Sequence, residues 1–214
     1  MIVCYKMSIV GSFSKEKLLE LCEFNKPNSV YSIAEYDMIN KGLCSVNRST
    51  APLYYTSFDG FPIGADGIYT IVWQQEANKN IQPAEMNWHH LWFDGEMKPQ
   101  AIKSFKSDYS LKTDWPAYLL LQHILRCNGT PIHVDGTLAC IYSDGRSLFL
   151  FRNEFGSLFI DHDFNLASIR FEGSQSVRPN EVLWMNFDTL KLRYIDEFET
   201  VKIPTNYYGE EYGT

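Results

Sequence analysis

One stretch of seven residues limits what this chain can fold into more than any other. Residues 91–97 read Leu-Trp-Phe-Asp-Gly-Glu-Met, an apolar run that leads into an acidic segment containing glycine. The pattern predicts a strand over residues 88–93 and a turn at Asp94-Gly95. We expect residues 7–11 and 113–115 to meet this stretch in space, so the function depends on what the three segments can do together.

The composition indicates a folded protein and argues against several classes of function. The chain has 214 residues, of which 45% are hydrophobic and 21% charged, so it can bury a substantial core. A net charge of -7 without a stripe of Lys and Arg argues against binding to nucleic acid. The apolar runs are too short to span a membrane, and the N-terminus lacks the order of a signal peptide. We therefore expect a cytoplasmic location without membrane contact.

The cysteine and histidine patterns predict no metal site. The five cysteines include no Cys-x-x-Cys pair and their number is odd, which is typical of reduced thiols in a cytosolic protein. His89 and His90 are adjacent, so in a strand they would point to opposite faces and would not share a metal ion. We expect neither a metal nor another cofactor.

Strand patterns dominate the chain, and two helices lie between groups of strands. Apolar and β-branched runs predict strands over residues 1–10, 30–38, 68–73, 88–93, 136–142, 147–153, 157–160, 167–171, 182–187 and 191–198. Residues 40–66 are predicted to be mostly loop, and residues 98–112 a mixture of a short helix and loop. Asp144-Gly145 predicts a hairpin turn. The resulting fold class is α+β with antiparallel sheets, in one domain over residues 1–204 followed by a polar tail over residues 205–214.

Two helices have recognisable start signals. Ser14 is the expected N-cap of the first, in which Leu18 and Leu21 share one face. The second is expected over residues 115–126, with Thr113 or Asp114 as its N-cap, because proline is tolerated in the first turn.

Several short motifs occur in a fixed order along the chain. They are Met7-Ser8-Ile9-Val10-Gly11, Asn25-Lys26-Pro27-Asn28-Ser29, Gln82-Pro83, Phe93-Asp94-Gly95-Glu96-Met97, Thr113-Asp114, residues 136–145, residues 150–156 and Leu166-Ala167-Ser168. This ordered set resembles the glutaminase domain of class II glutamine amidotransferases, as in asparagine synthetase and glucosamine-phosphate synthase. The resemblance implies a four-layer αββα sandwich of two antiparallel sheets, the N-terminal-nucleophile hydrolase fold.

The chain departs from this family at the positions that carry its chemistry. The family's nucleophile is an N-terminal cysteine whose own amino group acts as the base, and Met7, a thioether that cannot attack, stands at that position. The family holds the oxyanion with an asparagine side chain and the following glycine N–H, which here are Asp94 and Gly95. An ionised aspartate only accepts hydrogen bonds, and losing one donor costs about 3 kcal/mol of transition-state stabilisation.

The family's substrate contacts are matched only in part. The arginine that clamps the glutamine carboxylate has no counterpart in residues 68–73. Glu96 and Asp114 match the acidic residues that receive the substrate amino group, so the resemblance makes them the expected ligand-binding residues. The match therefore implies half of a ligand pocket without its reactive groups.

We accordingly expect a stand-alone, catalytically inactive relative that acts as a binding or interaction module for a protein partner or a small amino-acid-like ligand. Such a role would suit an accessory or viral protein. The alternative is an active glutamine amidohydrolase that uses a relocated nucleophile, for which Cys4 is the candidate after cleavage of residues 1–3. Cys4 lies three residues out of register with Met7, which turns its side chain to the other face of a strand.

Other uses of the same side chains stay open at this point. Asp94, Glu96 and Asp114 could form a carboxylate cluster for acid–base work or for a divalent cation, although a turn aspartate and a helix cap are the ordinary alternatives. Rings such as Trp88 and Trp92 could form an aromatic ligand box, but core packing is their more frequent use.

Overall fold

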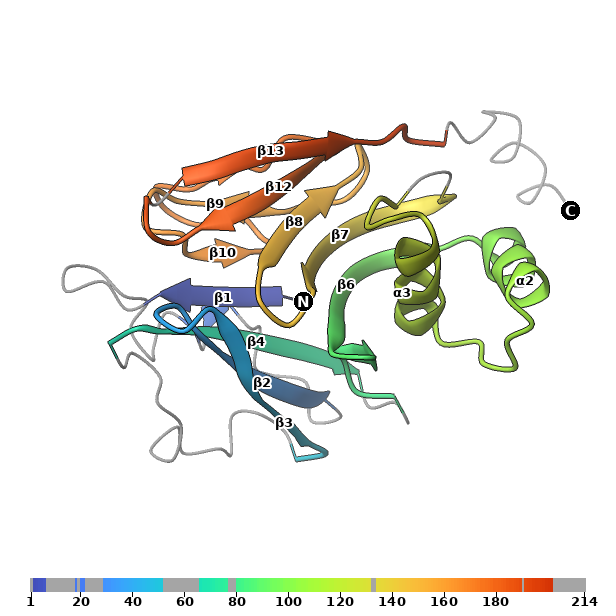
Figure 1. The fold of residues 1–214 in the computed structure, drawn as a ribbon, viewed down its shortest axis with the longest axis horizontal. Helices are drawn as coiled ribbons and strands as arrows, with labels where there is room; N and C mark the ends of the chain where they lie inside the picture. The colour runs from blue at the N-terminus through green and yellow to red at the C-terminus, as the bar shows by residue number, and fades with distance from the viewer. Residues whose placement is uncertain are drawn as a thin grey trace, which may run out of the picture.

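Two antiparallel sheets lie face to face in this protein, and two helices cover the outer side of one of them (Figure 1). The computed structural model describes residues 2–6, 18, 20–21, 29–51, 66–76, 80–131, 134–189 and 191–201. The predicted residues 7–11, the Ser14 cap and the polar tail lie outside this part of the chain.

The first sheet has seven strands among the described residues, in the order β11-β9-β10-β1-β4-β2-β3. Their bounds are β1 Ile2–Lys6, β2 Ser29–Asp37, β3 Gly42–Ser49, β4 Ile68–Glu76, β9 Phe159–Ile160, β10 Leu166–Ala167 and β11 Gln175–Ser176. β1 lies between β4 and β10, with Cys4 opposite both Ile71 and Leu166. The strands predicted over residues 30–38 and 68–73 are confirmed.

The second sheet has six strands in the described part of the chain, in the order β13-β12-β8-β7-β6-β5. Their bounds are β5 Ala84–Met86, β6 His89–Met97, β7 Gly136–Ser143, β8 Leu148–Arg152, β12 Glu181–Asn186 and β13 Lys191–Glu197. The hairpin predicted at Asp144-Gly145 is confirmed, and it joins β7 to β8. One oxygen of Asp144 accepts the N–H groups of Arg146 (2.8 Å) and Ser147 (2.7 Å), which closes the turn.

The two helices beside the six-stranded sheet are α2, Pro99–Asp108, and α3, Pro116–Arg126. The prediction that Thr113 or Asp114 caps α3 is wrong, because the N-cap is Trp115, whose own side chain makes no capping hydrogen bond. A residue before proline is pushed out of the helical region, and Trp115 is extended, so the helix begins at Pro116. The Thr113 hydroxyl instead accepts the N–H of Trp115 at 3.1 Å. Within the described residues no helix is long and apolar enough to cross a bilayer.

The inner layer between the sheets is a hydrophobic core to which both sheets contribute alternate residues. Ala34 and Ile71 come from the seven-stranded sheet, Trp92 and Ile141 from the six-stranded sheet, and all are fully buried. Tyr36 also joins the two sheets, because its hydroxyl on β2 donates to the carbonyl of Arg146 after β7. The buried side chains on the inner face of each sheet, together with the Tyr36 hydrogen bond, therefore hold the two sheets against each other.

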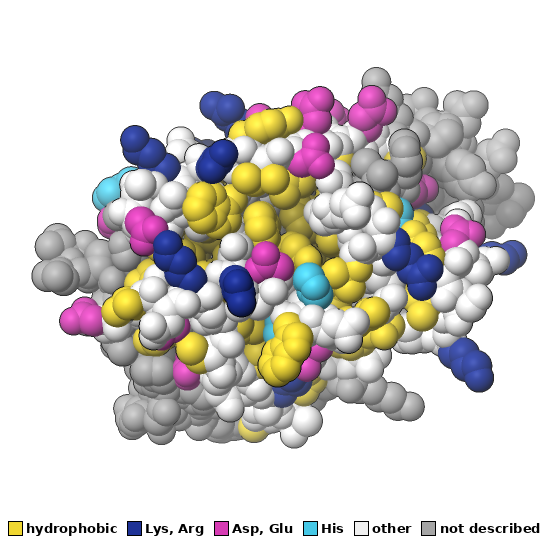
Figure 2. Space-filling view, in the orientation of Figure 1, with side chains coloured by type: hydrophobic (Ala, Val, Ile, Leu, Met, Phe, Trp, Pro, Cys, Tyr) yellow, Lys and Arg dark blue, Asp and Glu magenta, His cyan; other side chains and the backbone are white. Residues whose placement is uncertain are grey.

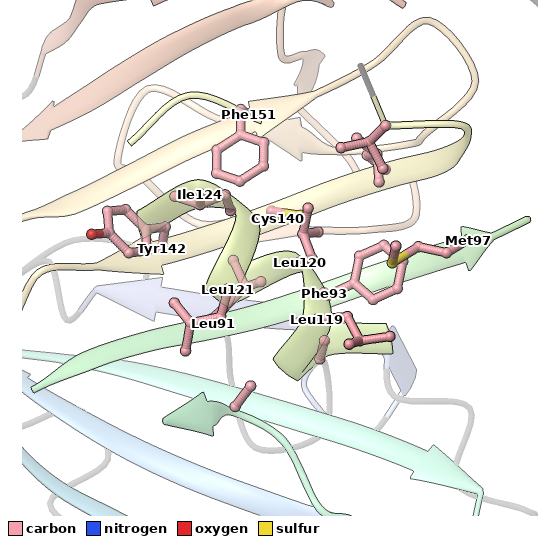
Figure 3. Close-up of a cluster of buried hydrophobic side chains, with 14 of the residues drawn as sticks. Leu91, Phe93, Met97, Leu119, Leu120, Leu121, Ile124, Cys140, Tyr142 and Phe151 are labelled. Carbon is pink, nitrogen blue, oxygen red and sulfur yellow. The ribbon is translucent and has the colours of Figure 1, made fainter. Parts of the chain in front are cut away.

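A second core fills the space between the six-stranded sheet and the helices (Figure 3). Leu91, Phe93 and Met97 of β6 point to this side together with Leu120 and Ile124 of α3. Burying each such side chain contributes about 2 kcal/mol. The outer face of the seven-stranded sheet is covered as well, since Ile33 and Val72 alternate with the inner-layer residues and are fully buried.

Residues 40–66, predicted to be mostly loop, contain a strand. β3 pairs with β2 from Tyr31 opposite Ser49 to Asp37 opposite Gly42. As an edge strand it is only half-buried, so it has no alternating apolar pattern that sequence reasoning could detect. β5 and β11, which have three and two residues, were equally without a pattern.

Asn153 is a fully buried residue that connects β7 to the loop after β8. Its side-chain oxygen accepts the N–H groups of Leu138 (3.0 Å), Phe155 (3.2 Å) and Gly156 (2.9 Å). Its amide nitrogen donates to the carbonyl of Gly136 at 2.7 Å. One side chain thus satisfies four backbone groups, and its bonds to Leu138 and Gly136 are fully buried.

We predict that Asn153→Ala lowers the free energy of unfolding by about 3 kcal/mol, because buried backbone groups lose their partners. Asn186→Ala is the matched control, since Asn186 accepts two backbone N–H groups in an exposed turn where water can replace it. Its cost should stay below about 1 kcal/mol. Urea unfolding of the two variants measures both values, and equal costs would contradict the role given to Asn153.

Tyr36 makes the stability depend on pH at the alkaline end. Burial, and secondarily the charge of Asp144, raises the pKa of Tyr36 to about 12. The unfolded chain loses this proton near pH 10 and the folded chain keeps it, so stability falls as the pH rises through that window. We predict that urea unfolding shows a smaller loss between about pH 9 and about pH 11 for Tyr36→Phe than for the unchanged protein. Identical losses would contradict this assignment.

Candidate functional site

The predicted turn at Asp94-Gly95 is wrong, because β6 continues straight through these residues to Met97. Asp94 pairs with Ala139 of β7, and Gly95 pairs with Leu138. The glycine serves a close approach between strands. With φ at 147°, a Cβ on Gly95 would lie 2.0 Å from the carbonyl oxygen of Thr137. A side chain at this position would therefore force β6 and β7 apart.

The alternation along β6 sets the direction of its acidic side chains. Leu91, Phe93 and Met97 face the helices, and Trp92 faces the core between the sheets (Figure 3). Asp94 and Glu96 therefore point to the same side as Trp92. Asp94 is half-buried and Glu96 is exposed. β1 contacts β6 across the two layers, so the end of β1 lies on the side to which these carboxylates point.

Gln82 fixes the free edge of β6 beside these residues. Its side-chain nitrogen donates to the carbonyl of Phe93 at 2.9 Å, and its side-chain oxygen accepts the N–H of Phe93 at 2.6 Å. The amide of Gln82 thus takes the place of a neighbouring strand beyond the end of β5. The Gln82-Pro83 motif carried no predicted role. The property that could have indicated this contact is the glutamine amide, which can both donate and accept hydrogen bonds.

The backbone of β6 directs one N–H group toward this same edge. The N–H of Glu96 turns to β7 and donates to the Thr137 hydroxyl at 2.8 Å. Because neighbouring amides of a strand alternate in direction, the N–H of Gly95 points to the edge shared with Phe93. The family resemblance would give this N–H the backbone role in an oxyanion hole. The position expected to supply a side-chain donor is Asp94, whose carboxylate, when ionised, supplies only acceptors.

Cys140 lies directly across from Phe93 and is fully buried. Burial, and secondarily the negative charge of Asp94, raises the pKa of the Cys140 thiol well above its usual value. The thiol is therefore protonated at neutral pH and is not a nucleophile. Its place on the helix side of the sheet makes it part of the second core.

Asp114 is separate from the other two carboxylates in its contacts. It is exposed, lies two residues before α3, and forms an ion pair with Lys106 of α2. Within the described residues no hydrogen bond or ion pair joins it to Asp94 or Glu96. Nor do these residues include a group of three His, Cys, Asp or Glu side chains placed to hold a metal ion, so the cluster of Asp94, Glu96 and Asp114 considered for a divalent cation is not formed.

The two candidate nucleophile positions differ in what the structure says of them. Met7 lies outside the described residues. Cys4 is in the middle of β1, where Ile2 and Val3 before it also pair with Trp73 and Val72 of β4. The chain at Cys4 is thus an internal strand position with a neighbouring strand on each side.

β4 is the strand that the resemblance expects to carry a substrate-binding arginine, and it contains none. Its polar residues are used inside the protein. Gln74 donates to the Ser29 hydroxyl at 3.1 Å. Gln75 accepts the indole N–H of Trp73 at 2.8 Å and the backbone N–H of Gln82 at 3.2 Å. The nearby Arg48 of β3 is held by Glu85 and by two carbonyl groups.

Comparison with known proteins adds evidence about the fold. No family model and no curated protein matches this sequence. Solved structures do match. Glutamine phosphoribosylpyrophosphate amidotransferase from B. subtilis superposes with a TM-score of 0.61 at 14% identity, covering 91% of this chain and 48% of its own. This chain thus spans about half the length of that enzyme.

Two further structures give the same picture. A glutamine aminotransferase class-II domain protein from Silicibacter pomeroyi has a TM-score of 0.51 at 14% identity, covering 92% of this chain and 99% of its own. An allosteric regulatory enzyme of purine biosynthesis has a TM-score of 0.57 at 13% identity, covering 83% of this chain and 44% of its own. Identities this low show the fold alone: the chain has the α+β N-terminal-nucleophile hydrolase sandwich of class II glutamine amidotransferase domains.

Proposed function

We propose that this protein is a class II glutamine amidotransferase-like scaffold that acts by binding and does not hydrolyse glutamine. The binding target is a protein partner or a small amino-acid-like ligand, as would suit an accessory or viral protein. The observation that carries the proposal is Asp94. Gly95, to which the family resemblance gives an oxyanion-hole role, lies in β6 close against β7, while the side chain before it, which should donate a hydrogen bond, is one that accepts it.

The energetic argument concerns the transition state of amide hydrolysis. Attack on the glutamine amide places a negative charge on its oxygen, and each donor in an oxyanion hole contributes about 3 kcal/mol to holding it. A carboxylate at position 94 removes that donor and adds repulsion at short range. The half-buried position of Asp94 reduces screening by water, which makes the repulsion larger than at an exposed site.

The nucleophile position supports the same conclusion. Met7 aligns with the family's catalytic cysteine by its motif, and a thioether has no proton to lose and does not attack an amide. The absence of arginine from β4 removes the expected partner of the substrate carboxylate. Three separate requirements of the reaction, namely nucleophile, oxyanion donor and substrate clamp, are thus unmet by the residues at the matching positions.

The alternative is an active glutamine amidohydrolase with Cys4 as an N-terminal nucleophile. The reaction would need a free amino group on Cys4, which requires cleavage after Val3. That cleavage would remove Ile2 and Val3, both of which pair with β4. The loss of these pairs from the middle of the seven-stranded sheet is the reason we favour the inactive reading.

We predict that the protein releases no ammonia from glutamine and acquires no covalent adduct from 6-diazo-5-oxonorleucine, an electrophilic analogue of glutamine. Ammonia is measured by a coupled glutamate dehydrogenase assay, and adducts are located by peptide mass mapping. An active class II amidotransferase treated in parallel is the positive control. An adduct on Cys4, together with ammonia release, would overturn the proposal in favour of the alternative.

A reconstruction tests the chemical reasoning directly. We predict that Met7→Cys with Asp94→Asn stays inactive while residues 1–6 are present, because the cysteine amine is then part of a peptide bond. Deleting residues 1–6 in the same variant frees that amine but also removes β1, Ile2–Lys6. Circular dichroism and urea unfolding therefore first select preparations that are folded, and these should give measurable reaction with the diazo analogue. The matched control carries the deletion and Met7→Cys but keeps Asp94, and it should react about 100-fold to 1000-fold more slowly with glutamine. Equal rates for the two deleted variants would show that Asp94 does not oppose the reaction.

A further inference from the structure

A hollow lies on the outer face of the six-stranded sheet, beyond the C-terminal end of α3. Figure 2 shows hydrophobic side chains gathered in it near the centre of this face, over β7, β8 and β12. The pocket has a volume of about 440 Å³. Its apolar lining comes from Leu125, Tyr142, Phe149, Val182 and Ile195. This size lies within the range of small-molecule sites, and the lining includes neither Asp94, Glu96 nor Asp114.

The hollow exists because α3 is too short to cover the sheet. α3 packs on β6 and β5 and ends at Arg126, so the helix-facing side chains of β8, β12 and β13 continue past its end. Ile195 of β13 is 47% exposed as a result. A concave, mainly apolar site of this size suits a small ligand.

One wall of the hollow carries a fixed polar pair. His89 Nδ1 lies 2.6 Å from the Tyr142 hydroxyl, and the two rings stack. Burial, followed by the charge of Asp144, raises the pKa of Tyr142 to about 12, so the phenol is neutral at physiological pH. The contact occupies Nδ1 and leaves Nε2 as the His89 nitrogen for a ligand. The pair therefore offers a flat and rigid surface with a neutral phenol.

The charged groups of the lining are both negative. Asp144 and Asp196 line the hollow, and no Lys or Arg is among its lining residues. Asp196 of β13 pairs with Val182 of β12, Val182 pairs with Phe151 of β8, and Phe151 pairs with Cys140 of β7, so Asp196 and Cys140 lie at the same height in the sheet. Asp144 comes four residues after Cys140 in the chain. Four residues of a strand span about 13 Å, so the two carboxylates lie toward opposite ends of the hollow.

The two carboxylates differ in how their oxygens are used within the described residues. Asp196 accepts the Thr130 hydroxyl on one oxygen and the N–H of Glu197 on the other, and the Thr130 contact is the main reason its pKa is lowered. Asp144 uses Oδ1 for the N–H groups that close its own turn. Its Oδ2 makes no hydrogen bond within the described residues, so Asp144 is the carboxylate that can pair with an incoming cation.

Trp88 stands next to this carboxylate. It is 85% exposed in the β5–β6 turn, and its carbonyl oxygen lies 3.2 Å from where a Cβ on Gly145 would be. Gly145 directly follows Asp144, so the turn that carries Trp88 lies against the turn that carries Asp144. An aromatic face beside a carboxylate is an arrangement that attracts organic cations.

We propose that this hollow binds a small organic cation with a flat apolar body. The body lies against Tyr142 and Phe149, and the ammonium or guanidinium group pairs with Asp144 Oδ2 beside Trp88. The site is on the face of the six-stranded sheet that packs on the helices, whereas Asp94 and Glu96 point away from that face. Ligand binding to the hollow is measured by titration, whereas the proposed function is tested by ammonia release from glutamine. Either experiment can therefore fail without affecting the other.

Phenethylamine is the probe, with 2-phenylethanol and 3-phenylpropionate as its neutral and anionic counterparts. Titration is followed by the amide shifts of Gly129, Gly145 and Ile195 in two-dimensional NMR spectra. We expect saturable shifts with a Kd of about 1 mM for the amine, which is reasonable for a ligand of this size. The alcohol should bind more weakly, and the carboxylate should not bind.

Variants separate the charge from the apolar surface. Asp144→Asn keeps the oxygen that closes the turn and should weaken the amine about fivefold while leaving the alcohol unchanged. Asp188→Asn is the matched control, because Asp188 is an exposed carboxylate that pairs with Lys41 outside the hollow, and it should change nothing. Ile195→Arg places a cation in the hollow and should abolish binding of the amine.

Several results would overturn the proposal. The first is equal affinity for the amine and the carboxylate, and the second is an amine affinity unaffected by Asp144→Asn. Shifts confined to residues away from the hollow would place the ligand elsewhere. The absence of any saturable shift with phenethylamine at about 10 mM would exclude the site for this class of ligand.

Discussion

The six-stranded sheet depends on the close approach of three backbone segments around Thr137 and Leu138. A Cβ on Gly95 would lie 2.0 Å from the Thr137 carbonyl oxygen, and a Cβ on Gly156 would lie 1.8 Å from the Leu138 carbonyl oxygen. β7 is therefore held between β6 and the loop after β8 at distances that only glycine permits. Asn153 completes the constraint, because its side chain bonds to β7 and to that loop. The position of Asp94 in space follows from this arrangement.

Sequence patterns predicted the elements whose side chains alternate between a core and another layer. β4, the β7–β8 hairpin and the helix α3 were located because burial on one or both faces leaves a periodic apolar signal. β3 was missed because an edge strand with one pairing partner is stabilised by its backbone and needs few apolar side chains. The same physical reason explains the wrong turn at Asp94-Gly95. Aspartate and glycine favour turns locally, but pairing with Ala139 and Leu138 overrides that preference.

The arrangement of the candidate site residues differs in part from what their motifs suggested. Asp94, Gly95 and Glu96 do form one short segment of β6, whereas Asp114 is held by Lys106 and makes no bond to them within the described residues. Short motifs name residues but do not say which neighbours a side chain will find. The sequence favours Asp114 as a helix cap. The residue before Pro116 must be extended, however, so α3 begins at Pro116 with Trp115 as its N-cap, and Asp114 lies outside the helix. The hollow was not predicted at all, because its lining comes from five strands and a helix end that are distant in sequence.

The residues that match the family motifs and those that do not differ in their roles. Gln82, Gly95 and Gly156 match the family motifs, and each makes a backbone contact that the sheet needs. Asn153 stands where the family motif has aspartate, and it makes such contacts as well. Met7, Asp94 and β4 without arginine are the mismatches, and these positions carry the chemistry in the family. The persistence of the first group is thus explained by folding alone and is no evidence for catalysis. β6 illustrates the separation, since its C-terminal half holds Asp94 in a fixed frame while its first residue, His89, lines a hollow of different chemistry on the other face of the sheet. A scaffold of this kind can lose reactivity at one end without losing the packing that shapes a binding surface at the other.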